Sequence, residues 1–410
     1  DSEWITWITF GFYLVVLVLI GLWGDRRHGR SYEGFVSADK SLGSWVAAIS
    51  SAASSESAWV MLGLSGLGYK SGVAAYWAAT GCTVGFLVTS LFVVVQLRRS
   101  SGGMQILTLG DYLENVLHDR RHVIKIVSSL LIAFFMQVYV IAQFVGTGKQ
   151  MAGMDLLSYH WGVAAGAVII GIYVLIGGYA AVCWTDTLQG LLMALVMIAF
   201  PVLAVTRVGG PGAVMAGLPE GLTSIWAGGE GLTWGAVGFA LGQFGIGIGY
   251  PGMPHSIIRF ITVKDEKEAR DAAIIGVVWG ALVLFGAVTL GVAGRVLMPG
   301  LDDPEHVLPA FTATLHPVIG GVILAAVTAA IMSTADSQLM MAATAMIHDL
   351  WGSLRRGGRA VSRFRVAHTR VLIGALSLVA LGLALIEPRV IYTFVLFAAL
   401  GWAIKRAARP

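Results

Sequence analysis

The chain has 410 residues, of which 57% are hydrophobic and only 12% are charged, and its mean hydropathy is +0.78. A soluble domain carries roughly 25% charged residues, and a soluble protein of this size needs more polar surface than these residues supply. The composition therefore excludes a soluble protein and predicts an all-α, polytopic protein of the lipid bilayer. The net charge of +4 comes mostly from loops, so we assign it to membrane topology and expect no nucleic-acid partner.

Eleven apolar stretches follow one another, each close to the ~20 residues that a membrane-spanning helix needs. They lie at 4–23, 43–67, 73–97, 123–149, 157–177, 179–206, 232–260, 272–297, 316–350, 366–386 and 388–404. When the loops alternate between two sides, 22 of the 27 Lys and Arg residues fall on one side. The positive-inside rule makes that side cytoplasmic, which predicts a multi-pass cell-membrane protein with its N-terminus outside. Residues 107–117 are interpreted as a short interfacial helix on the cytoplasmic side.

Two of the predicted spans are poor continuous helices. Residues 49–63 contain five serines and Glu56, and residues 242–260 contain five glycines and two prolines. Glycine costs a helix about 1 kcal/mol, and proline removes a backbone donor. The interruptions are five spans apart, so their helices run in opposite directions. This pattern is typical of a 5+5 inverted repeat with a substrate site near the bilayer midplane, and two unrelated kinks are the alternative.

Polar residues interrupt the ninth span at 332–338, MSTADSQ. Ser333, Asp336 and Ser337 share one helix face, and Thr334 lies beside it. A set of ligands made only of oxygen atoms favours a hard cation, and an acid at membrane depth indicates function by default. For the Ser and Thr hydroxyls, hydrogen bonding to a carbonyl of the preceding turn is the alternative.

A second acid, Asp186, lies about two turns inside the sixth span. Capping of the helix start is the alternative to a functional role. Cys82 and Cys183 have no metal-ligating neighbours in the sequence, so neither a disulfide framework nor a zinc site is expected. For His255 we expect a structural hydrogen bond. The side chain of Glu56 is assigned to no site and is expected to face a water-filled vestibule.

Four motifs in chain order carry a resemblance to a known family: SSAASSESAWVMLGLSG, GGYAAVCWTDTLQG, GMPHSIIRF and AAIMSTADSQL. They resemble the signature segments of the sodium:solute symporter family, most closely those of bacterial sodium/proline symporters. The resemblance extends from the first span to about residue 395. It implies a leucine-transporter-type fold in a single transmembrane domain, 1–410. The extra N-terminal helix is then 4–23, the first five-helix repeat 43–206 and the second repeat 232–404.

The resemblance also implies the binding residues. The family's sodium site corresponds to the main-chain carbonyls of Ala53, Glu56 and Ala330 and the hydroxyls of Ser333 and Thr334. A second Na⁺, bound by some members, corresponds to Asp186, Ser333, Asp336 and Ser337. The solute site corresponds to Ser55, Tyr139, Gln143, Ile246, Tyr250 and Pro254.

The implied activity is sodium-coupled symport of a small organic solute by alternating access, not catalysis. Proline or a similar amino acid is the first expectation. However, Ile246 replaces a tryptophan of the proline carriers, and Ser55 replaces an aspartate that would face the substrate's ammonium group. A symporter for a monocarboxylate, a sugar or pantothenate is therefore the alternative, followed by a transporter-like sensory module. The sequence shows neither the repeated filter of a channel nor the nucleophile–base pair or metal cluster of a membrane enzyme.

Overall fold

The computed structural model describes residues 3–28, 37, 41–101, 106–176, 179–229, 231–354 and 362–386. The first half contains α1 (Glu3–His28), α3 (Ser44–Ser55), η2 (Trp59–Leu64), α4 (Ser65–Ser71), η3 (Gly72–Ala75), α5 (Tyr76–Thr89), η4 (Ser90–Val94), α6 (Val95–Ser101), α7 (Leu109–Val116), α8 (Val123–Gly153), α9 (Tyr159–Ile176) and α10 (Tyr179–Val208). The second half contains α11 (Pro211–Gly217), α12 (Trp234–Gly245), η5 (Ile246–Gly252), α13 (Pro254–Ile261), α14 (Glu266–Leu297), η6 (Pro304–His306), α15 (Val307–Ala313), α16 (Pro317–Thr344), η7 (Ala345–Trp351), α17 (Gly352–Leu354) and α18 (Ser362–Ile386).

The first ten predicted spans are mainly helical over their described residues, with non-helical residues inside 43–67 and 232–260, whereas the last span, 388–404, lies outside the described residues. Six continuous helical segments in the described ranges are long and apolar enough to cross a membrane, and α1 and α9 hold shorter apolar stretches. The short helix predicted at 107–117 is present as α7, Leu109–Val116. The short helices α11 and α15 lie in loops for which we predicted no helix.

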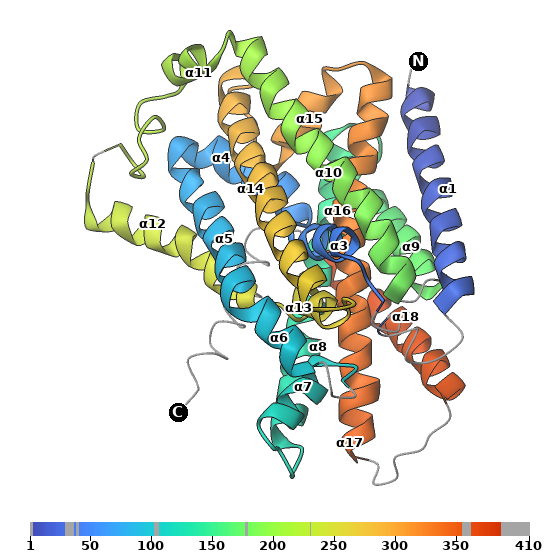
Figure 1. Ribbon diagram of the computed structural model, residues 1–410. Helices are drawn as coiled ribbons and strands as arrows, with labels where there is room; N and C mark the ends of the chain where they lie inside the picture. Colours follow the sequence, from blue (N-terminus) through green and yellow to red (C-terminus); the bar gives the residue numbers. More distant parts are fainter. Residues whose placement is uncertain are drawn as a thin grey trace.

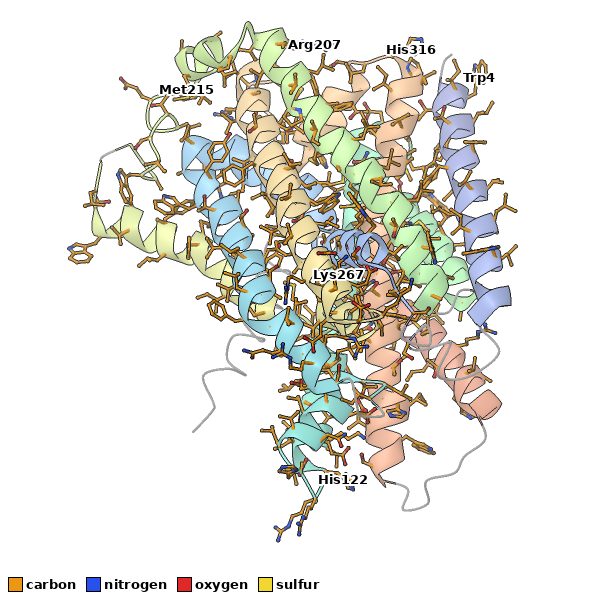
Figure 2. The ribbon with its side chains drawn as sticks, viewed as in Figure 1. Trp4, His122, Arg207, Met215, Lys267 and His316 are labelled. Atoms are coloured by element: carbon orange, nitrogen blue, oxygen red, sulfur yellow. The ribbon has the colours of Figure 1, made fainter. Side chains whose placement is uncertain are left out.

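Helix α16 forms the centre of the bundle. It packs against α8, α1, α10, α18 and α3, and its residues 323–344 are all buried. By contrast, α1 exposes Ile8, Phe12 and Leu19 on its outer face, as expected for a lipid-facing helix. Figure 1 shows α11 and α15 at one end of the bundle, called the α15 end below, and α7 and α17 at the other, called the α7 end. In Figure 2, Trp4 and His316 lie at the α15 end and His122 at the α7 end.

Helix α14 begins at Glu266, six residues before its predicted start at residue 272. Its first turn is polar and is capped by Asp265, whose side chain accepts a hydrogen bond of 2.9 Å from the Glu268 N–H. Such a cap satisfies one of the free donors at a helix start. Hydropathy alone detects the apolar part of a helix and therefore misses a polar first turn of this kind.

Ion pairs connect helices at both ends of the bundle. At the α15 end, the Lys149 Nζ on α8 lies 2.8 Å from Asp303 and 2.6 Å from Glu305. Partial burial opposes ionisation of Asp303, but its bonds to Lys149 and to the Glu305 N–H hold its pKa below the ordinary value. At the α7 end, Lys125 Nζ lies 2.7 Å from Asp111 Oδ1. The side chains of Asp111, His348 and Asp349 are close enough together to hold a metal ion. The Lys125 ammonium places a positive charge beside this group.

Close helix packing depends on glycines of α14. A methyl group at Gly291 would lie 1.9 Å from the Ser65 carbonyl oxygen, whereas one at Gly276 would meet no atom within 4 Å. Small residues let membrane helices approach closely, so Gly291→Ala should lower the unfolding temperature of the detergent-purified protein by several degrees. Gly276→Ala, in the same helix, is the control and should not lower it. Equal unfolding temperatures for the two variants would contradict this packing.

Candidate functional site

The first helix interruption lies between α3 and η2. Helix α3 ends at Ser55, and Glu56 leaves the helical conformation with φ −103° and ψ 73°. The Ser54 and Ser55 hydroxyls donate to the carbonyls of Ser50 and Ser51, at 2.8 Å in each case. Serine hydroxyls that bond one turn back in this way compete with the main-chain ladder and weaken the helix. The serine-rich sequence thus favours a helix that stops near the middle of the span.

The interruption brings α3 into contact with α16. The Ser333 hydroxyl lies 3.2 Å from the Ala53 carbonyl oxygen and 3.2 Å from the Ala330 carbonyl oxygen. Thr334 is fully buried, and its hydroxyl has no hydrogen-bond partner among the described residues. Two carbonyls, one shared hydroxyl and one unpartnered buried hydroxyl form a set of neutral oxygens. Such a set fits a hard monovalent cation better than a softer transition metal.

A second polar cluster surrounds Asp186 on α10. Asp186 Oδ2 accepts hydrogen bonds from the hydroxyls of Ser50 at 2.8 Å and Ser54 at 3.2 Å. Its third partner is Arg259 Nη2 at 2.7 Å, and both side chains of this ion pair are almost completely buried. Arg259 Nη2 also donates to the Ser337 hydroxyl at 2.6 Å. The cluster therefore joins α3, α10, α13 and α16 through one guanidinium group.

Asp336 lies next to this cluster and forms no ion pair with a guanidinium group among the residues that the structure describes. Its Oδ1 accepts from the Ser337 hydroxyl at 3.1 Å, and Asp336 interacts electrostatically with Asp186 and Arg259. Asp336 Oδ2 and Asp186 Oδ1 are buried without a hydrogen-bond partner in the part of the chain that the structure describes. The two unpartnered carboxyl oxygens are ligands of the kind that a second hard cation prefers.

The predicted solute residues fall into two groups. Tyr139 and Gln143 on α8 face the first interruption: the Tyr139 hydroxyl lies 3.1 Å from the Ser57 hydroxyl, and Gln143 Oε1 accepts from the Ala58 N–H at 3.2 Å. Tyr250, in the second interruption, packs against Phe86 in a tilted ring pair with centroids 4.4 Å apart. The Tyr139 side chain connects the two interruptions, since it also lies 6.2 Å from the ring of His255.

The other three predicted solute residues have main-chain or packing roles in the structure. The Ser55 hydroxyl is bonded within its own helix, and Pro254 begins α13 at its first position, which suits a residue without an N–H. Ile246 is buried at the start of η5, which packs on α5.

Sequence reasoning missed two buried charged side chains at this site. Arg259 was counted among the charges that flank the membrane, yet it is only 1% exposed and pairs with Asp186. The sequence signal for a buried Arg259 was its position inside the predicted span 232–260, four residues after His255. The Glu56 side chain is also fully buried, and so does not face the water-filled vestibule that we expected.

The comparisons with solved structures establish the fold. The substrate-bound, outward-open state of a Na⁺-coupled sialic acid symporter matches with a TM-score of 0.79 and 19% identity, covering 94% of this chain and 82% of that one. MhsT in complex with L-phenylalanine matches with a TM-score of 0.62 and 14% identity, covering 88% and 85%. Mhp1, a nucleobase-cation-symport-1 family transporter, matches with a TM-score of 0.56 and 12% identity, covering 89% and 77%. The protein has the leucine-transporter-type fold that the sequence predicted.

The family follows from sequence similarity. A family model described as the sodium:solute symporter family matches residues 35–407. A sodium/proline symporter of Staphylococcus aureus (strain USA300 / TCH1516) is 33% identical over 395 residues, which is 94% of this chain and 75% of the relative. The chain belongs to the sodium:solute symporter family. It is a multi-pass membrane transporter that couples solute movement to sodium, and not an enzyme.

Proposed function

We propose that the protein imports a small amino-acid zwitterion together with Na⁺, with proline as the first substrate to test. The contact between Ser333 and the carbonyls of Ala53 and Ala330, beside the unpartnered Thr334 hydroxyl, supports this proposal most directly. The sequence similarity to sodium/proline symporters supports the solute class. The proposed location is the cell membrane, with the N-terminus outside.

The first proposed Na⁺ binds to the carbonyls of Ala53, Glu56 and Ala330 and to the hydroxyls of Ser333 and Thr334. The ion would hold the end of α3 against α16 and thereby stabilise one arrangement of the two repeats. A transported ion drives the cycle only if it binds one state more tightly than the other. Sodium and solute together would favour the occluded state, from which the repeats can move against each other.

A second Na⁺ is proposed between Asp186 and Asp336, with Ser333 and Ser337 as further ligands. The unpartnered oxygens Asp186 Oδ1 and Asp336 Oδ2 fit a cation here. Asp186 already forms an ion pair with Arg259, so the ion would share Asp186 with the guanidinium group.

The energy of one sodium ion is sufficient for solute accumulation. One ion crossing a membrane potential of ~100 mV supplies about 2.3 kcal/mol, and a tenfold concentration gradient adds about 1.4 kcal/mol. At about 1.4 kcal/mol for each factor of ten, the sum supports roughly 500-fold accumulation of solute. A second ion would raise this limit further.

Uptake into proteoliposomes tests the proposal. Radiolabelled proline should accumulate when an inward sodium gradient is imposed and should not accumulate when choline replaces sodium. Competition by unlabelled amino acids, monocarboxylates, sugars and pantothenate then defines the solute class. Sodium-driven uptake of a sugar or a monocarboxylate but of no amino acid would contradict the proposed solute. The absence of sodium-driven uptake for every compound would contradict symport.

A further inference from the structure

The side chain of Glu56 is a buried acid that the sodium site does not use. It is 0% exposed, and neither carboxylate oxygen has a hydrogen-bond partner among the residues that the structure describes. An ionised carboxylate in a low-dielectric environment is strongly unfavourable unless it is paired. Glu56 occupies the helix interruption, where transporters of this fold class place their substrate sites. A positively charged group of the solute is therefore a suitable partner.

The surroundings of Glu56 belong to the predicted solute site. Next to Glu56, the Ser57 hydroxyl lies 3.1 Å from the Tyr139 hydroxyl on α8, and Tyr250 in η5 packs against Phe86 on α5 with ring centroids 4.4 Å apart. On α14, a methyl group added at Gly280 would lie 2.8 Å from Glu56 Oε1 and 3.1 Å from the Phe86 ring. The carboxylate thus lies against α14 near Phe86 of α5, and the assigned solute residues Tyr139 and Tyr250 contact its neighbours Ser57 and Phe86.

Aromatic rings beside the carboxylate favour a cation over other polar groups. The rings of Phe86 and Tyr250 contact each other in a tilted arrangement, with centroids 4.4 Å apart and an interplanar angle of 57°, and both are buried. Ring faces attract ammonium groups, and this attraction is strongest where water is excluded.

The neighbouring position cannot supply this charge. Ser55 carries no charge, and its hydroxyl donates to the Ser51 carbonyl of its own helix. Glu56 follows directly, at the point where the main chain leaves the helical conformation. A carboxyl group is therefore present at the interruption, one residue further along the chain than Ser55, and it can pair with a cation once one is bound.

We propose that the Glu56 carboxylate binds the ammonium group of the solute and thereby restricts the substrate to amino acids and related zwitterions. The proposal rests on the proposed symport function and specifies its solute. A monocarboxylate would place a second negative charge beside Glu56, and juxtaposed like charges oppose binding. A sugar would leave the carboxylate unpaired. Because the main-chain carbonyl of Glu56 belongs to the proposed sodium site, sodium and solute would bind to one residue.

Thermal unfolding of the purified protein in detergent provides the test. The probes are the twenty L-amino acids, each paired with its counterpart lacking the amino group; for proline this is tetrahydrofuran-2-carboxylate. Glucose, pyruvate and pantothenate complete the panel, and every probe is measured in sodium and in choline buffer. The wild type should be stabilised in sodium by at least one amino acid and not by its counterpart. In Glu56→Gln, the dissociation constant of that amino acid should rise at least about 30-fold, as for loss of one partner of a buried charge pair.

Two controls distinguish the loss of the carboxylate charge from misfolding of the variant. Glu56→Asp keeps the carboxylate and should retain more affinity than Glu56→Gln. Sodium alone should still stabilise Glu56→Gln, because the main-chain carbonyl is unaltered, and this result shows that the variant is folded. If Glu56→Gln binds the amino acid with the same affinity as the wild type, the proposal is overturned. The same holds if only the pH dependence of amino-acid binding changes. Preferential stabilisation by a sugar or a monocarboxylate also overturns it, but leaves sodium symport intact. No sodium-dependent response to any probe contradicts the symport function itself.

Discussion

Replacing Thr334 with Ala should raise the sodium concentration for half-maximal uptake at least tenfold, with a smaller effect on the maximal rate at saturating sodium. The Thr334 hydroxyl is buried and has no hydrogen-bond partner in the described part of the chain, and we propose that it is a sodium ligand. A tenfold loss of affinity corresponds to about 1.4 kcal/mol, and a hydrogen bond or ligand contact to a charged group contributes about 1.5–3 kcal/mol. The measurement is initial uptake in proteoliposomes across a sodium series.

Two further variants serve as controls for this prediction. Thr334→Ser keeps the hydroxyl and should remain close to wild type. Thr328→Ala removes a buried threonine of the same helix that is not itself a proposed ligand, and should not change the sodium dependence. If Thr334→Ala and Thr328→Ala give the same sodium curve as wild type, the assigned ion site is wrong.

Breaking the ion pair between Asp186 and Arg259 should destabilise the protein strongly. Removal of one partner of a buried pair leaves an uncompensated charge and costs about 3–5 kcal/mol. Both Asp186→Asn and Arg259→Met should therefore unfold at a much lower temperature or denaturant concentration than wild type. Asp186→Asn should also require more sodium for half-maximal uptake, because Asp186 is a proposed ligand of the second ion.

The double variant distinguishes pairing from simple packing. Asp186→Asn combined with Arg259→Met removes both charges, so it should be less destabilised than the sum of the two single variants. Arg207→Met, which alters an exposed arginine at the α15 end, should cost little stability. Additive losses in the double variant would show that the two side chains do not stabilise each other.

The broken helices were predictable because their causes are local. Serines at 50, 51, 54 and 55 and the glycines and prolines of 242–260 weaken helices through their own main-chain preferences. The structure confirms both interruptions, as the gap after α3 and as η5. The spans were predictable for a similar reason, since hydropathy depends on composition. Helix α15 was missed because Val307–Ala313 is too short to produce a membrane-span signal.

The charged part of the site was less predictable because it depends on tertiary contacts. Asp186 and Arg259 are 73 residues apart in sequence, and no local pattern shows that their side chains meet. The sequence had led us to expect a sodium ion as the partner of the two acids. In the structure a guanidinium group is the direct partner of Asp186, so the second sodium ion remains a proposal. Glu56 was set aside because its burial depends on α5, α8 and α14, which approach from distant parts of the chain.

Equilibrium binding of ²²Na⁺ to the purified protein tests the central claim most directly, because it requires neither solute nor transport. That claim is that oxygens at the interruption after α3 and on α16 together bind sodium. The wild type should bind Na⁺ saturably, and the double variant Ser333→Ala/Thr334→Ala should bind one ion fewer per molecule or bind it at least tenfold more weakly. An identical binding curve for the folded double variant would contradict the claim.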